Sequence, residues 1–96
     1  MELINNPNFI YSYKSPVGLF FIRYNPSVGK WELGIEDDVF GYYTTTIAAA
    51  DDVYTQSTDC YEWDMLNLDT IINIAPTDIY EWKRTPYNEF DYQGDE

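Results

Sequence analysis

The strongest constraint on the fold is a change in the period of the apolar residues between positions 31 and 54. From residue 31 to residue 36 apolar and polar side chains alternate, which is typical of a half-buried strand. From residue 46 to residue 54 apolar side chains recur three and four positions apart, which is typical of an amphipathic helix. Two such elements bury their apolar faces against each other, so the chain is predicted to form a sheet with a helix packed on it.

The alternating segment places Trp31, Leu33 and Ile35 on one face of a strand. Glu32 and Glu36 then lie on the opposite face, because successive side chains of a strand point to opposite sides. The apolar face is the predicted seat of the helix.

Neighbouring segments have the composition of further strands. Residues 19–24 and 39–43 are aromatic and apolar, and turn-forming residues separate them from the central strand at 25–29 and 37–38. Residues 9–13 alternate weakly and are expected to add a strand at the edge of the sheet.

The helix is predicted to begin at Thr44–Thr46, whose hydroxyl groups can cap its first free amides. Ile47, Ala50 and Tyr54 then form one apolar stripe. A helix of about three turns is not stable alone in water, so it must lie on the sheet.

The C-terminal third is less regular. Residues 60–68 are predicted as an irregular loop or a single helical turn, and residues 70–74 as a short strand or extended segment. Pro76 suits the first turn of a short helix that ends at Lys83–Arg84. Residues 85–96 have no apolar period and predict a mobile acidic tail.

The predicted fold class is therefore α+β. It consists of an antiparallel meander of three or four strands, with one main helix packed on one face and a short C-terminal helix. Residues 1–84 form the single domain, since 96 residues suffice for one modest core. The predicted core contains Trp31, Trp63 and Trp82.

Several classes of enzyme are excluded by composition. The chain has no histidine, which excludes the usual histidine-dependent hydrolases and typical zinc sites. Its one cysteine, Cys60, stands among carboxylates that raise a thiol pKa, so a structural role is predicted. One cysteine forms no intrachain disulfide, which fits a reducing cytosol.

Paired acids are compatible with two further kinds of site. Glu32 and Glu36 have a spacing that carboxylate-based glycoside hydrolysis can use, but nothing in the sequence indicates a cleft. Asp37–Asp38 and Asp51–Asp52 offer oxygen ligands, but the spaced acidic loop of a calcium site is absent. No catalytic residue, metal or cofactor is predicted.

Localisation follows from two absences in the sequence. No apolar run reaches the roughly 20 residues of a membrane span. The first residues lack the basic start and apolar core of a signal peptide. The protein is expected in the cytosol of a bacterial host, without a membrane partner.

Charge is the main functional indication, because 17 acidic residues against 5 basic ones give a net charge of -12 at pH 7. Such a surface repels nucleic acid and anionic lipid, so a charged partner would be basic. Acids on alternate strand residues, or three to four apart on a helix, stand about 6–7 Å apart and can imitate phosphates, which recur with about 3.4 Å of axial rise. The candidate partner-binding residues are Glu32, Glu36, Asp37, Asp38, Asp51, Asp52, Asp59, Glu62 and Asp64, with Tyr42 and Tyr61 as aromatic contacts.

The same charge has a simpler interpretation. A coat of solvated acids keeps a small domain soluble without binding anything. An exposed rim of tyrosine and carboxylate residues would favour a binding role over this coat.

The central region resembles a family of small uncharacterised bacterial and phage-borne proteins. The matching segments are Trp31–Leu33, Gly41–Tyr43, Ala49–Val53, Trp63–Asp64 and Pro76–Trp82. The resemblance covers about residues 16–82, with Ile79 in place of the family's leucine. It implies a domain of this extent and no activity. By charge and size alone, the chain is also similar to acidic phage inhibitors, including anti-CRISPR and anti-restriction proteins that imitate DNA.

The predicted function is that of a non-enzymatic acidic interaction protein from a phage or mobile element. It would bind a basic nucleic-acid-binding host protein and block it, without binding nucleic acid itself. The alternative is a bacterial module that binds a protein or small ligand through exposed aromatic residues. A small carboxylate-based hydrolase is the third candidate.

Overall fold

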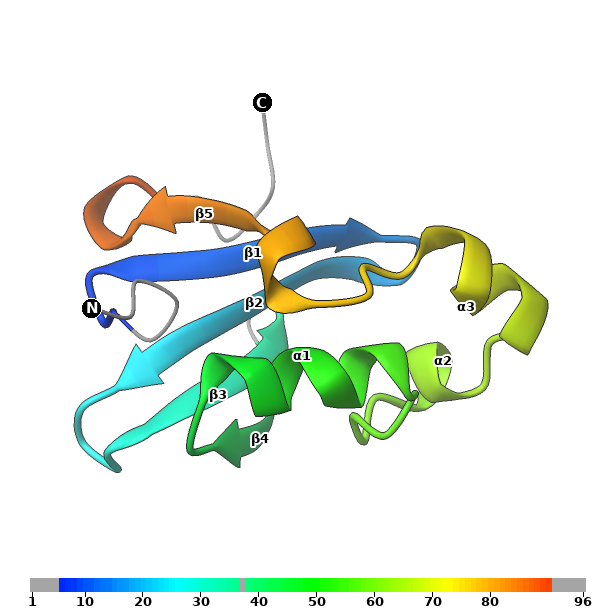
Figure 1. Ribbon diagram of the computed structural model, residues 1–96. Coiled ribbons are helices and arrows are strands. Elements are labelled where there is room, and N and C mark those ends of the chain that lie inside the picture. Colours follow the sequence, from blue (N-terminus) through cyan, green and yellow to red (C-terminus); the bar gives the residue numbers. More distant parts are fainter. Residues whose placement is uncertain (1–5, 37, 91–96) are drawn as a thin grey trace.

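The computed structural model describes residues 6–36 and 38–90 and confirms the predicted α+β class (Figure 1). Five strands form one open antiparallel sheet in the order β4-β3-β2-β1-β5. The strands are β1 Phe9–Ser15, β2 Gly18–Asn25, β3 Lys30–Ile35, β4 Asp38–Tyr43 and β5 Lys83–Pro86. The helical segments are α1 Thr46–Tyr54, α2 Tyr61–Asp64, α3 Leu68–Ile74 and the 3-10 turns η1 Ile79–Glu81 and η2 Tyr87–Glu89.

The main core lies between the sheet and α1, as the sequence predicts. The register pairs Ile22 with Leu33 and Tyr24 with Trp31 across β2 and β3, and their side chains face the helix. Ala49, Ala50 and Val53 of α1 belong to the same buried cluster. The small alanine side chains let the helix approach the strands closely.

All three tryptophans are buried, which confirms their predicted place in the core. The indole of Trp63 meets the ring of Phe20 edge-on, with 5.1 Å between centroids. Its Nε1–H donates a hydrogen bond of 2.8 Å to the Val53 carbonyl oxygen. Trp63 therefore joins α2 to both the sheet and the last turn of α1.

The buried face of α1 differs from the predicted stripe. Thr46, Ala49, Ala50 and Val53 are its buried residues, whereas Ile47 is 46% exposed, so the prediction for Ile47 was wrong. The Thr45 hydroxyl accepts from the Ala48 amide at 3.1 Å and fixes the first turn. With that start, residues at i, i+3, i+4 and i+7 from position 46 face the sheet.

The fifth strand corrects the predicted edge of the sheet. β1 pairs with β5 in the register Phe9 to Pro86 through Ser12 to Lys83, so β1 is an inner strand. Lys83 and Arg84 belong to this strand and do not end a helix. The guanidinium of Arg84 lies 4.6 Å from the centre of the Phe9 ring, a cation–π contact across the pair.

The sheet also continues past the predicted domain boundary at residue 84. Thr85 and Pro86 complete β5, and the Tyr87 amide donates to the Asn8 carbonyl oxygen at 2.8 Å. Of the predicted tail, residues 91–96 lie outside the described residues.

Residues 70–74 are helical, so the prediction of a strand or extended segment was wrong. The Asn67 side chain accepts from the Asp69 amide at 2.8 Å and caps α3, which buries Ile71. Here the cap and the buried contact outweigh the strand preference of the β-branched residues. The predicted C-terminal helix is the single turn η1, capped by Asp78.

A β-bulge in β4 makes Gly34 a sensitive position. Leu33 pairs with Gly41 but Gly34 pairs with Val39, so one extra residue of β4 separates the two pairs. A Cβ atom on Gly34 would collide with the Asp38 carbonyl oxygen and stand 2.7 Å from Cζ of Phe21.

We expect Gly34→Ala to lower the free energy of unfolding by about 1–3 kcal/mol, because backbone must shift to admit the methyl group. Urea denaturation measures the change. Gly41→Ala is the matched control in the next strand, since its methyl group would meet only the movable side chain of Tyr43 at 3.3 Å. Equal losses in the two variants would contradict the described packing at Gly34.

Candidate protein-interaction surfaces

The first acidic surface, here called the strand–turn surface, is the exposed pair Glu36 and Asp38. The two residues flank the turn between β3 and β4, and Asp37 between them lies outside the described residues. Glu36 has a left-handed backbone, with φ of 54°. Tyr42, at the other end of β4, is also exposed.

Glu32 does not belong to this exposed set. It is only 4% exposed, and its carboxylate accepts from Arg23 Nε at 3.1 Å, from Arg23 Nη2 and from the Asn25 side chain. Arg23 is its direct partner across β2 and β3, and it also stacks on the Phe21 ring at 5.2 Å. The negative charge of Glu32 is therefore compensated within the chain.

The second acidic surface, here called the α1–α2 surface, spans both helices and the loop between them. It consists of Asp51, Asp52, Asp59, Glu62 and Asp64. Asp51, Asp59 and Glu62 are exposed, and the other two are half-buried. Among residues 6–36 and 38–90, no lysine or arginine forms an ion pair with any of the five.

The hydroxyl group of Tyr43 is influenced by three of these acids. Its hydroxyl donates to Oδ2 of Asp52 at 2.8 Å. Burial raises the pKa of Tyr43 well above its ordinary value, and the negative charges of Asp52, Asp59 and Asp64 raise it further. Three carboxylates from two helices and a loop thus act on one hydroxyl group, which the spacing of the acids in the sequence did not indicate.

Asp64 also stabilises the loop that precedes α2. Its carboxylate accepts from the amide and hydroxyl of Thr58, at 3.1 and 2.8 Å, and from the Asp59 amide at 2.9 Å. Hydrogen bonds from several donors to one carboxylate fix the loop before α2. Part of the negative charge therefore holds the fold together.

Gln56 also holds α2 in place, through hydrogen bonds from its side chain to the backbone of the helix and of the residues that follow. This role was not predicted from the sequence. Its side-chain amide donates to the carbonyl oxygens of Trp63 at 3.0 Å and Leu66 at 2.8 Å. The residue has a left-handed backbone, with φ of 59°. A lone glutamine in a loop carries no pattern by which such a role is predicted.

Two large apolar side chains are exposed at the two ends of α2. Tyr61 is 73% exposed and Met65, which follows the last residue of α2, is 64% exposed. The predicted contact Tyr61 therefore stands at the surface, next to acids of the α1–α2 surface. Met65 was not among the predicted contacts.

Cys60 precedes α2 and is buried. Burial raises the pKa of its thiol, and the carboxylates of Glu62 and Asp64 raise it further. The thiol therefore stays protonated at neutral pH, and the thiolate that a nucleophile requires is disfavoured.

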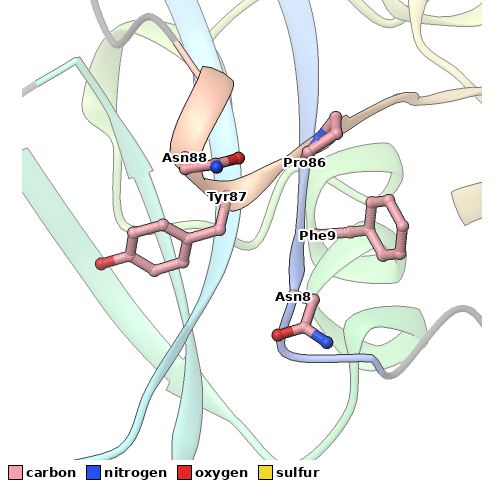
Figure 2. Close-up of a pocket in the computed structure, with 5 residues that line it drawn as sticks. All are labelled: Asn8, Phe9, Pro86, Tyr87 and Asn88. Atoms are coloured by element: carbon pink, nitrogen blue, oxygen red, sulfur yellow. The ribbon is translucent and has the colours of Figure 1, made fainter.

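A shallow pocket of about 470 Å³ lies where β1 begins and β5 ends. It is lined by Asn8, Phe9, Pro86, Tyr87 and Asn88 (Figure 2). The rings of Phe9 and Tyr87 point in opposite directions in Figure 2, and the lining contains no carboxylate or amine. Tyr87 is therefore the one ionisable side chain among the lining residues.

Within the described part of the chain, no three acids or cysteines gather in a way that would hold a metal ion. The described helices include none long and apolar enough to cross a membrane. Comparison of the chain with protein-family models, curated proteins and solved structures found no match in any of the three.

Proposed function

We propose that the protein is a non-enzymatic acidic interaction protein that binds a basic nucleic-acid-binding protein in the cytosol of a bacterial host. It would act as an inhibitor of phage or mobile-element origin, of the anti-CRISPR or anti-restriction type. The observation that carries this proposal is the α1–α2 surface, whose five carboxylates have no lysine or arginine partner among the described residues, and three of which act on Tyr43.

Electrostatics explains why such a surface favours a cationic partner. Neighbouring carboxylates repel one another, and the pKa of Tyr43 is raised first by burial and then by the negative charges of Asp52, Asp59 and Asp64. Arginine and lysine side chains of a partner relieve that repulsion and accelerate association. A groove that normally binds nucleic acid supplies these cations, so protein and nucleic acid would compete for it.

The second candidate is a module that binds a protein or ligand through aromatic residues. The exposure of Tyr42, Tyr61 and Tyr80 favours it. A hydrolase receives less support, because Glu32, one of the two acids it would use, is engaged with Arg23 and Asn25. Salt separates the first two candidates, since screening weakens charge-driven binding and leaves apolar contacts largely intact.

The test compares two charge-reversed baits in an affinity capture from host lysate. One carries Asp59→Lys and Glu62→Lys, and the other carries Glu36→Lys and Asp38→Lys. Each pair of changes adds +4, which moves the net charge from -12 to -8, so the baits match in charge and differ only in position. Glu32 is left unchanged because its replacement would disturb the buried pair with Arg23.

We expect the parent protein and the strand–turn variant to retain the same nucleic-acid-binding protein at low salt. The α1–α2 variant should lose it, and added duplex DNA or high salt should release it from the parent bait. Retention of the same proteins by all three baits, or release that is indifferent to DNA and salt, would contradict the proposal.

A further inference from the structure

We infer that the α1–α2 surface recognises its partner through an apolar anchor, the exposed pair Tyr61 and Met65, which exposed carboxylates flank in the chain. The occupant is a cationic protein segment that carries a large apolar side chain among its lysines and arginines. This inference rests on the proposed function and narrows it from a general attraction between opposite charges to one defined contact.

The two anchor residues are neighbours on the surface of the helical turn. The Met65 amide donates to the Tyr61 carbonyl oxygen at 3.0 Å, so the residues are one helical turn apart and their side chains emerge on the same side. Both side chains are mostly exposed, as given above. Tyrosine supplies a large rigid contact at low entropic cost, and methionine adapts its shape to a partner.

Two exposed acids lie beside these residues in the chain. Glu62 follows Tyr61 directly, and Asp59 lies two residues before it. Both carboxylates are exposed, and neither forms an ion pair with another described residue. Exposed apolar side chains close to charged ones are typical of a protein-binding surface, and the negative sign of these charges favours a cationic partner.

The anchor is also held rigidly, which lowers the entropic cost of binding. A helix of four residues is not stable alone, so α2 depends on its tertiary contacts. Trp63 of the same helix is fully buried and bonded to Val53, and Gln56 binds the carbonyl oxygen of Leu66. The backbone that carries Tyr61 and Met65 is thus held in place before the partner arrives.

Two fluorescent peptides test this inference by anisotropy titration at low salt. The first is a repeat of lysine and glycine, and the second is the same peptide with its central glycines replaced by leucine. We expect the parent protein to bind the leucine peptide about tenfold more tightly than the plain peptide. Tyr61→Ala with Met65→Ala should remove this preference while retaining the weaker binding of both peptides.

Two control variants distinguish the anchor from general effects. Val28→Ala with Tyr80→Ala removes side chains that are 51% and 74% exposed on other parts of the protein, and the preference should persist. Tyr61→Phe with Met65→Leu conserves the apolar patch and should also retain it. All variants should melt like the parent, because the replaced side chains are exposed.

Each outcome decides a different question. If the parent protein binds both peptides equally, or if the Tyr61 and Met65 double alanine variant keeps the preference, the anchor is overturned and the proposed function stands. If the parent binds neither peptide, both the proposed function and the anchor are overturned.

Discussion

Trp63→Ala should lower the free energy of unfolding by about 3–5 kcal/mol, a large share of the 5–15 kcal/mol typical of a domain. The indole is fully buried and packs edge-on against Phe20 and Tyr13, with centroids 5.1 and 5.9 Å away. Its removal leaves a cavity between α2 and the sheet, and it leaves the Val53 carbonyl oxygen without the Trp63 donor. Urea denaturation followed by circular dichroism measures the loss.

Two control variants identify the source of that loss. Tyr61→Ala truncates another aromatic residue of the same four-residue helix, but its exposed side chain should change stability by no more than about 0.5 kcal/mol. Trp63→Phe keeps part of the ring and removes the Nε1–H donor, so it should cost about 1–3 kcal/mol. Similar stabilities of Trp63→Ala and Tyr61→Ala would refute the described position of α2.

Arg23→Ala should lower the free energy of unfolding by about 2–3 kcal/mol, because it leaves the buried Glu32 carboxylate without a cation. This loss is smaller than for a fully buried pair, because the Arg23 side chain is 27% exposed and water screens part of its charge. Asn25 remains as a donor to Glu32 and offsets some of the cost. Thermal or urea unfolding at neutral pH measures the change.

The double variant Arg23→Met with Glu32→Leu is the informative control. Replacement of both partners removes the unpaired charge, so its stability should lie above that of Arg23→Ala and close to the parent. Lys30→Ala, which removes an exposed cation from the neighbouring strand, should have little effect. If Arg23→Ala and Lys30→Ala behaved alike, the pair with Glu32 would contribute nothing to the fold.

The sheet meander and α1 are predictable from sequence because their signals are local. Alternation at Trp31, Leu33 and Ile35 and the cap at Thr45 each lie within one element. The exact face of α1 is not local, because it depends on which residues the sheet can admit. Ile47 fits the helical period, but the close approach of Ala49 and Ala50 to the strands turns it outward.

The elements that escaped prediction are those that a distant partner determines. Lys83–Pro86 has neither apolar alternation nor strand composition, and it becomes a strand by pairing with β1. Residues 70–74 have a strand composition, but they form a helix because Asn67 caps it and Ile71 reaches the core. Local propensity is a weak guide in such segments.

In the candidate surfaces, too, local features can be predicted from the sequence, whereas contacts with distant residues cannot. The sequence identifies every acid, but it does not indicate which of them form ion pairs or hydrogen bonds within the folded protein. Glu32 is neutralised by a residue nine positions earlier and Asp64 holds the loop at Thr58, whereas Glu62 is exposed and, among the described residues, accepts only a long hydrogen bond of 3.8 Å from Cys60 Sγ. Neighbouring acids thus differ in availability because of partners that no local pattern reveals.

The pairing of β1 with β5 has a consequence for synthesis of the protein. Ser12 of β1 pairs with Lys83 of β5, which is synthesised 71 residues later, so this edge of β1 stays unpaired until then. At about 5–20 residues per second, a ribosome leaves this edge open for roughly 4–14 s. Local hairpins can form during that interval, but the nascent chain carries an unpaired strand edge that can join another chain. The interval in which the protein is most prone to aggregation therefore ends with the emergence of β5.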